Sequence, residues 1–139
     1  MRLAMIVVLA AGCGGMGPQN TETLTESVQA YNEGIRWSRF EVAATHIPPA
    51  QRAQFVDDWD QRSKDLRITD YEVVKVEPRG PAEARVEVKL EWYLDSEGKV
   101  RETRATQTWE KHGKLWLVVD ESRVRGEKMP GLPEPLMKE

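Results

Sequence analysis

The carboxylates and imidazoles that acid–base or metal chemistry would need are few in this sequence. Asp57 and Asp60 lie one helical turn apart, with Asp58 beside them, and could share a metal ion or a proton. They also fit the solvated face of a helix whose other side carries Phe55 and Trp59, and we favour that interpretation. The sequence has no Ser/His/Asp arrangement, no HExxH motif and no Gly-rich phosphate loop. We therefore expect neither a metal site nor a cofactor, and no catalytic residue can be named.

The two histidines and one Asp-Tyr pair are the other acid–base candidates. His46 lies near the end of an expected short helix, where it could face inward as an acid or base, or simply complement the helix C-terminus. His112 stands beside Gly113 in an expected hairpin turn, so we expect it to be exposed. Asp70 and Tyr71 begin an expected strand and could point inward together. None of these positions carries a catalytic pattern by itself.

Large aromatic side chains are the more unusual feature. Five tryptophans make up half of the ten aromatic residues, so a small core must accommodate several indole rings. Tyr31, Trp59, Trp92 and Trp109 fall on apolar faces, and Gln107 shares the face of Trp109. These residues could line a ligand pocket with Gln107 as its polar anchor. They could equally fill the core, and we favour the filled core.

Helical patterns occupy the first half of the chain and must position part of this aromatic set. Thr23 and Glu26 have capping-box spacing, which predicts the start of a helix. Ser38 and Glu41 repeat that spacing and predict a short second helix, which ends before Pro48-Pro49. A third helix is expected to run to about residue 65. The apolar face of the first helix comprises Leu24, Val28, Tyr31 and Ile35.

A period of two replaces the helical period from residue 67 onward. Strands are expected at residues 67–77, 84–94, 99–111 and 114–121. Residues 84–94 alternate almost perfectly between apolar and charged side chains, which is typical of an antiparallel strand with one wet face. The last strand is apolar on both faces, which fits either a central strand or a dimer interface.

Length and composition agree with one α+β domain. The 139 residues carry a net charge of −3 and 40% hydrophobic residues, which suits a single globular domain. Helices followed by a four-stranded meander exclude a doubly wound nucleotide-binding fold. An acidic chain is also a poor partner for nucleic acid, because phosphate binding needs a basic surface.

Several motifs resemble the cone-shaped nuclear-transport-factor-2-like superfamily over roughly residues 24–121. They are RWSRFEVAATHI, AQRAQFVDDWDQRSKDL, VEVKLEWYL and TQTWEKHGKLWLV. The resemblance implies three N-terminal helices on a curved four-stranded antiparallel sheet, a pocket inside the cone, and dimerisation through the sheet. Members include ketosteroid isomerase and scytalone dehydratase, which hold an Asp or His in an apolar cone, as well as many non-catalytic modules. The fold therefore does not choose a function.

The N-terminus resembles a bacterial lipoprotein signal peptide. Residues 3–11 are apolar, a run far shorter than the roughly 20 residues of a membrane-spanning helix. The small residues Ala10-Ala11-Gly12 directly precede Cys13, the single cysteine. The resemblance implies cleavage before Cys13 and acylation there, so that Cys13 anchors the protein to a membrane.

These features together predict a domain order and a function. We expect a signal peptide at residues 1–12, a linker at 13–20, the cone domain at 21–122 and a mobile proline-containing tail at 123–139. The predicted function is a non-catalytic envelope lipoprotein that binds a small apolar ligand or a partner protein. Its expected location is the outer membrane, facing the periplasm, with a homodimer through the sheet as one form. The alternative is a lipid-anchored isomerase, dehydratase or hydrolase with a buried Asp or His.

Overall fold

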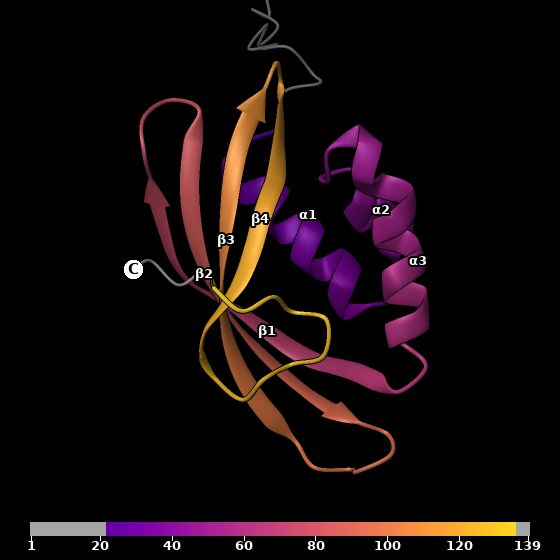
Figure 1. Ribbon diagram of the computed structural model, residues 1–139. Coiled ribbons are helices and arrows are strands. Elements are labelled where there is room, and N and C mark those ends of the chain that lie inside the picture. The colour runs from indigo at the N-terminus through magenta and orange to yellow at the C-terminus, as the bar shows by residue number, and fades with distance from the viewer. Residues whose placement is uncertain (1–21, 136–139) are drawn as a thin grey trace, which may run out of the picture.

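A computed structural model of the chain describes residues 22–135, and it contains helices on one side of a strongly twisted sheet (Figure 1). The helical half comprises α1 (Leu24–Arg36), α2 (Phe40–Ala44), the 3₁₀ turn η1 (Pro49–Gln51) and α3 (Arg52–Arg62). The strands are β1 (Leu66–Pro78), β2 (Glu83–Leu94), β3 (Arg101–His112) and β4 (Leu115–Gly126). They pair in the order β1-β2-β3-β4, each antiparallel to the next. The predicted α+β fold with a four-stranded meander is confirmed, whereas the predicted signal peptide and linker lie outside the described residues.

The start of α1 follows its sequence signal, but the start of α2 does not. Thr23 caps α1, and its hydroxyl accepts a hydrogen bond from the Glu26 backbone N–H at 3.1 Å. The predicted cap at Ser38 is wrong, because α2 is preceded by Arg39 and has no side-chain cap. Ser38 instead adopts a positive φ of 57°, in the tight turn between the two helices.

A glycine lets α1 and α2 approach closely at this turn. A Cβ atom on Gly34 would lie 2.9 Å from the Cβ of Ala43 and 3.0 Å from its backbone nitrogen. Both residues are buried. Glycine at position 34 therefore permits the helix contact at the modest cost of a weak helix former near the end of α1.

Helix α3 ends three residues before its predicted end. The backbone carbonyl of Asp65 accepts a hydrogen bond from the Asp95 N–H at 2.8 Å, and its carboxylate accepts two from Ser96. These contacts hold residues 63–65 against the loop between β2 and β3. Leu66, just after the predicted end of the third helix, is the first residue of β1 and is buried there.

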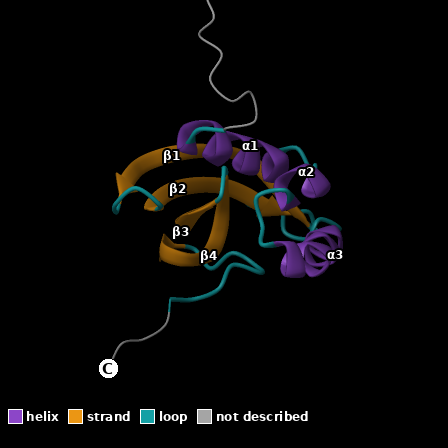
Figure 2. Cartoon of the chain, turned by 90° about the horizontal axis from the view of Figure 1, so that it is seen from above, coloured by secondary structure: helices purple, strands orange, loops and turns teal. Residues whose placement is uncertain are grey.

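The inner face of the sheet carries the core, as the alternation of residues 84–94 predicts. Viewed from above, the helices gather on one side of the curved sheet (Figure 2). The pairing of β2 with β3 has no register shift, so inward positions stay inward along both strands. The inward residues of these two strands are Ala84, Val86, Val88, Leu90, Trp92, Thr103, Ala105, Gln107 and Trp109, and all are buried.

The pairing of β3 with β4 contains a bulge that reverses the alternation of β4. Trp109 pairs with Val118, whereas Thr108 pairs with Asp120, so Val119 is an extra residue on β4. An extra residue moves the side chains that follow it to the opposite face, here as far as a second bulge at Val124. As a result Glu121, rather than Asp120, lies opposite an inward residue of β3.

The outer face of the sheet carries charged side chains, and some of them form ion pairs between neighbouring strands. Lys89 lies 3.0 Å from Glu72, and Arg104 lies 3.5 Å from Glu87. Such mixed charges are well solvated on a face open to water.

The homodimer through the sheet stays a prediction. Within residues 22–135, no helix has the length and apolar character to cross a membrane.

The chain beyond residue 122 differs from the predicted mobile tail. Strand β4 continues to Gly126, and residues 127–135, here called the C-terminal strap, turn back over the domain (Figure 1). Met129 of the strap is only 5% exposed, and Arg123 forms an ion pair of 2.7 Å with Glu134. The docking of the strap leaves little trace in the sequence, because the strap packs through single side chains and turns. It has no repeating apolar face that a sequence pattern could reveal. The predicted domain end at residue 122 and tail from 123 therefore do not describe residues 123–135.

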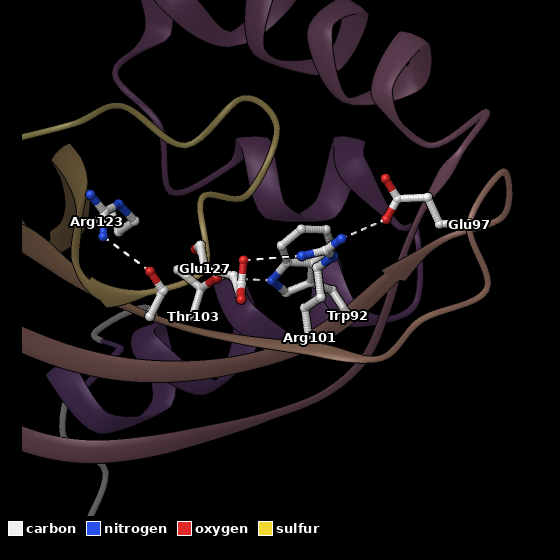
Figure 3. A network of polar contacts seen from close by, with 7 residues as sticks. Trp92, Glu97, Arg101, Thr103, Arg123 and Glu127 are labelled. Carbon is white, nitrogen blue, oxygen red and sulfur yellow. Dashed lines mark hydrogen bonds and ion pairs between the residues drawn. The ribbon is translucent and has the colours of Figure 1, made fainter.

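A polar network ties the start of the strap to the hairpin formed by β2 and β3 (Figure 3). Trp92 Nε1 donates to Thr103 Oγ1 at 2.9 Å, and that hydroxyl in turn donates to the Glu127 carbonyl. The Arg101 guanidinium bridges the carboxylates of Glu127 at 3.0 Å and Glu97 at 2.8 Å. The buried indole N–H of Trp92 thus has a partner, and the strap has a fixed starting point.

Candidate functional site

A pocket of about 270 Å³ opens where α3, β4 and the C-terminal strap meet. Its floor is formed by Tyr31 of α1 and Glu121 of β4, and its walls by aromatic and aliphatic side chains together with Gln51, Asp58, Arg62 and Asp120. The size suits a small molecule of few heavy atoms. The lining residues are Tyr31, Ile47, Gln51, Phe55, Asp58, Trp59, Arg62, Val118, Val119, Asp120, Glu121, Met129, Gly131, Leu132 and Pro133.

Glu121 is the polar centre of this pocket. One carboxylate oxygen accepts a hydrogen bond from Gln107 Nε2 at 2.7 Å, and the other accepts one from the Tyr31 hydroxyl at 3.3 Å. Gln107 is itself held in place, because its Nε2 donates to Asn32 at 2.9 Å and its Oε1 accepts from the Trp109 indole at 3.2 Å. The carboxylate therefore sits on a prearranged network that joins α1, β3 and β4.

Burial raises the pKa of both floor residues. Desolvation raises the pKa of Glu121 above its ordinary 4.5, while the hydrogen bonds from Gln107 and Tyr31 and the positive charge of Arg62 oppose that rise. Burial, followed by the charge of Glu121, raises the pKa of Tyr31 well above its ordinary 10.0. Tyr31 thus stays a neutral phenol whose proton is directed at Glu121, and Glu121 titrates closer to neutrality than an exposed glutamate.

The sequence-predicted ligand residues divide between the pocket and the core. Tyr31 and Trp59 line the pocket, and Gln107 lies directly behind Glu121. Trp109 is fully buried and meets the Tyr31 ring edge-on, with centroids 5.8 Å apart. Trp92 is 1% exposed and bonded to Thr103, away from the pocket. Ligand binding by these residues stays a prediction.

The acid–base candidates from the sequence lie apart from the pocket floor. His46 is buried beside β4, with Nδ1 3.3 Å from the Trp116 carbonyl and Nε2 3.8 Å from Glu22. Asp57 and Asp60 are exposed on α3, as the helix-face interpretation expects.

The remaining candidates also lie at or near the surface. Asp70 is exposed, and the Tyr71 hydroxyl donates to Glu33 at 2.8 Å. His112 is exposed and lies 3.1 Å from Glu110. In the described part of the chain, no three His, Cys, Asp or Glu side chains are placed to hold a metal ion together.

Glu121 is not among the residues predicted from the sequence. By strict alternation from Trp116 and Val118, Asp120 would face inward and Glu121 would face outward. The bulge at Val119 exchanges the two, and Glu121 comes to lie opposite Gln107. A Gln on an apolar face in β3 was the available signal, since a buried amide needs a polar partner from a neighbouring strand.

Comparisons with known proteins place the fold. Neither a protein-family model nor a curated protein matches the sequence. A ketosteroid isomerase-like protein from Erwinia carotovora atroseptica aligns with 78% of this chain and 99% of its own, at 11% identity and a TM-score of 0.61. The two chains share the α+β cone fold. RPA3114, a SEC-C motif containing protein from Rhodopseudomonas palustris, aligns with 76% of this chain and 80% of its own, at 12% identity and a TM-score of 0.62. Identities this low show the cone fold alone, so function must be argued from the pocket.

Proposed function

We propose that this chain is a lipid-anchored envelope protein whose cone pocket binds a small ligand and does not convert it. The observation that carries the proposal is the pocket of about 270 Å³, in which the half-buried carboxylate of Glu121 lies below walls that combine aromatic and aliphatic side chains with a few polar ones. Pockets that bind small molecules combine mostly apolar walls with few fixed polar groups. The anchor rests on the sequence around Cys13.

The hydrogen bonds of Glu121 favour binding over catalysis. Tyr31, the floor residue that could polarise a substrate, directs its proton at Glu121. Gln107 directs its amide at the other carboxylate oxygen. Both donors are therefore engaged in holding the carboxylate, which leaves Glu121 as a recognition group with unused lone pairs.

An acid–base enzyme is the second candidate, and one observation favours it. Burial raises the pKa of Glu121, which brings a carboxylate nearer to the range useful for proton transfer at neutral pH. In that case Glu121 takes the role predicted for a buried Asp or His.

The binding proposal is tested with a fragment library that holds neutral, cationic, anionic and zwitterionic small molecules. Saturable binding is followed by the melting temperature and by tryptophan emission, to which Trp59 contributes from the pocket wall. Leu132→Trp should block the pocket and abolish binding. Leu115→Trp is the matched control, because Leu115 is 45% exposed and lies outside the pocket.

The outcomes separate the two candidates. Recovery of the bound fragment unchanged, as followed by NMR, supports a binding protein, whereas accumulation of a product that depends on Glu121 supports the enzyme. Equal binding by the Leu132→Trp and Leu115→Trp proteins would contradict any role for this pocket.

A further inference from the structure

Two opposite charges face the pocket without neutralising each other. Arg62 extends from the last turn of α3, and Glu121 lies on the floor. Among residues 22–135 neither forms an ion pair within 4.0 Å, although the positive charge of Arg62 acts on Glu121 across the pocket. Each charge is therefore available to a ligand group that enters between them.

The arginine is held in position by its neighbours. Its guanidinium carbon lies 4.7 Å from the centre of the Trp59 ring, one turn earlier on α3. On the strap side, Gly131 packs so closely that a Cβ atom there would collide with Arg62 Nε. A guanidinium held between an indole and a backbone is prearranged to receive a carboxylate.

The remaining charges of the pocket lie at its rim. Asp58 is exposed and accepts a hydrogen bond from Gln54, and Asp120 is exposed beside the bulge of β4. Water screens both carboxylates, so they would attract a cationic group to the entrance more than they would hold it. The apolar part of a ligand would meet the aliphatic and aromatic walls, which are Ile47, Phe55, Val118, Met129 and Leu132.

We propose that the pocket binds a zwitterion with an apolar side chain, namely a free amino acid or a very short peptide. Its ammonium group would bind Glu121, its carboxylate would bind Arg62, and its side chain would pack on Phe55. A purely cationic ligand would leave the guanidinium without a partner, and a purely anionic one would face Glu121. Only a ligand that carries both charges satisfies both groups. This inference rests on the proposed binding function.

The test measures the affinity of four related compounds by calorimetry. They are L-leucine, the cation L-leucinamide, the anion N-acetyl-L-leucine and the neutral 4-methylpentanamide, and the dipeptide Leu-Leu distinguishes a peptide from a free amino acid. We expect L-leucine or Leu-Leu to bind at least about tenfold more tightly than the compounds with one charge, because each charge-assisted hydrogen bond contributes about ten- to a hundredfold.

Variants assign each charge to its partner. Arg62→Gln should weaken zwitterion binding and leave L-leucinamide unaffected, whereas Glu121→Gln should weaken the zwitterion and leave N-acetyl-L-leucine unaffected or improved. Glu121→Gln preserves the shape of the side chain, and Arg85→Gln is the control because Arg85 is exposed on β2 outside the pocket.

The results distinguish this inference from the proposed function. Tightest binding by 4-methylpentanamide, or equal affinity for all compounds in both variants, would overturn the zwitterion and leave a pocket that binds apolar ligands. Library fragments that bind while none of the leucine compounds does would overturn it in the same way. Failure of every compound and every fragment to bind would refute the binding function itself.

Discussion

The C-terminal strap offers the sharpest test of the fold, through the substitution Met129→Ala. Met129 is 5% exposed and belongs to the same apolar cluster as the core of the cone. Removing a buried Met side chain costs about 2–5 kcal/mol in the free energy of unfolding. The strap can also undock, which would limit the cost to the free energy of docking. We therefore expect a loss in the lower part of that range, about 2–3 kcal/mol.

The assay is unfolding of the full chain in urea, with Val124→Ala as the control. Val124 is 43% exposed on β4, so its truncation should change stability by no more than about 0.5 kcal/mol. Hydrogen exchange supplies an independent readout, because the Arg123 N–H donates to the Pro133 carbonyl at 2.8 Å. We expect this amide to be protected in the wild type and to exchange faster in Met129→Ala.

A small loss of stability in Met129→Ala would contradict the docking of the strap. If Met129→Ala and Val124→Ala were equally stable, and if the Arg123 amide exchanged freely in the wild type, the strap would not be docked. The sequence prediction of a mobile tail would then hold, and the pocket would lose one of its walls.

Three further predictions follow from the pocket and the termini. Burial raises the pKa of the Glu121 carboxyl above 4.5, so the folded state holds the carboxyl proton more tightly than the unfolded chain does. The contribution of Glu121 to the free energy of unfolding therefore falls as pH rises from 4.5 through the folded-state pKa. Glu121→Gln should remove that fall, as measured by urea unfolding at a series of pH values; an unchanged pH profile would contradict the burial of Glu121. Gly131→Ala should lower the melting temperature more than Gly113→Ala, since both glycines have a positive φ but only at Gly131 would the new Cβ meet Arg62. Cys13→Ser should yield unprocessed or poorly anchored protein in a bacterial membrane fraction, and mass spectrometry of the wild type should find acyl chains on Cys13; a free thiol on the full-length wild type would count against the anchor.

The order of elements could be predicted because each element carries a local signal. The capping residue Thr23 and the apolar spacing of α1 need no tertiary information. The alternation of residues 84–94 also predicts which face of β2 is buried, since β2 pairs with β3 without a register shift. The cap predicted at Ser38 is wrong for a tertiary reason, because the close contact at Gly34 requires a tight turn there.

The pocket could be predicted only in part, because its parts come from distant segments. Tyr31 and Trp59 stand on apolar helix faces that a sequence pattern reveals. Glu121 is invisible to that pattern, because a single extra residue at Val119 exchanges the inner and outer faces of β4. Arg62 would ordinarily be expected in solvent at a helix end, and its place in the pocket depends on the strap.

By itself, the sequence determined the elements, their order and the core face of the central strands, because helix and strand periods are properties of neighbouring residues. It also determined the net charge and the presence of one cysteine. Only the tertiary structure decided which carboxylate enters the cone, where Arg62 stands and how the last residues close the pocket. These depend on register between strands and on single contacts between distant residues, for which no local period exists.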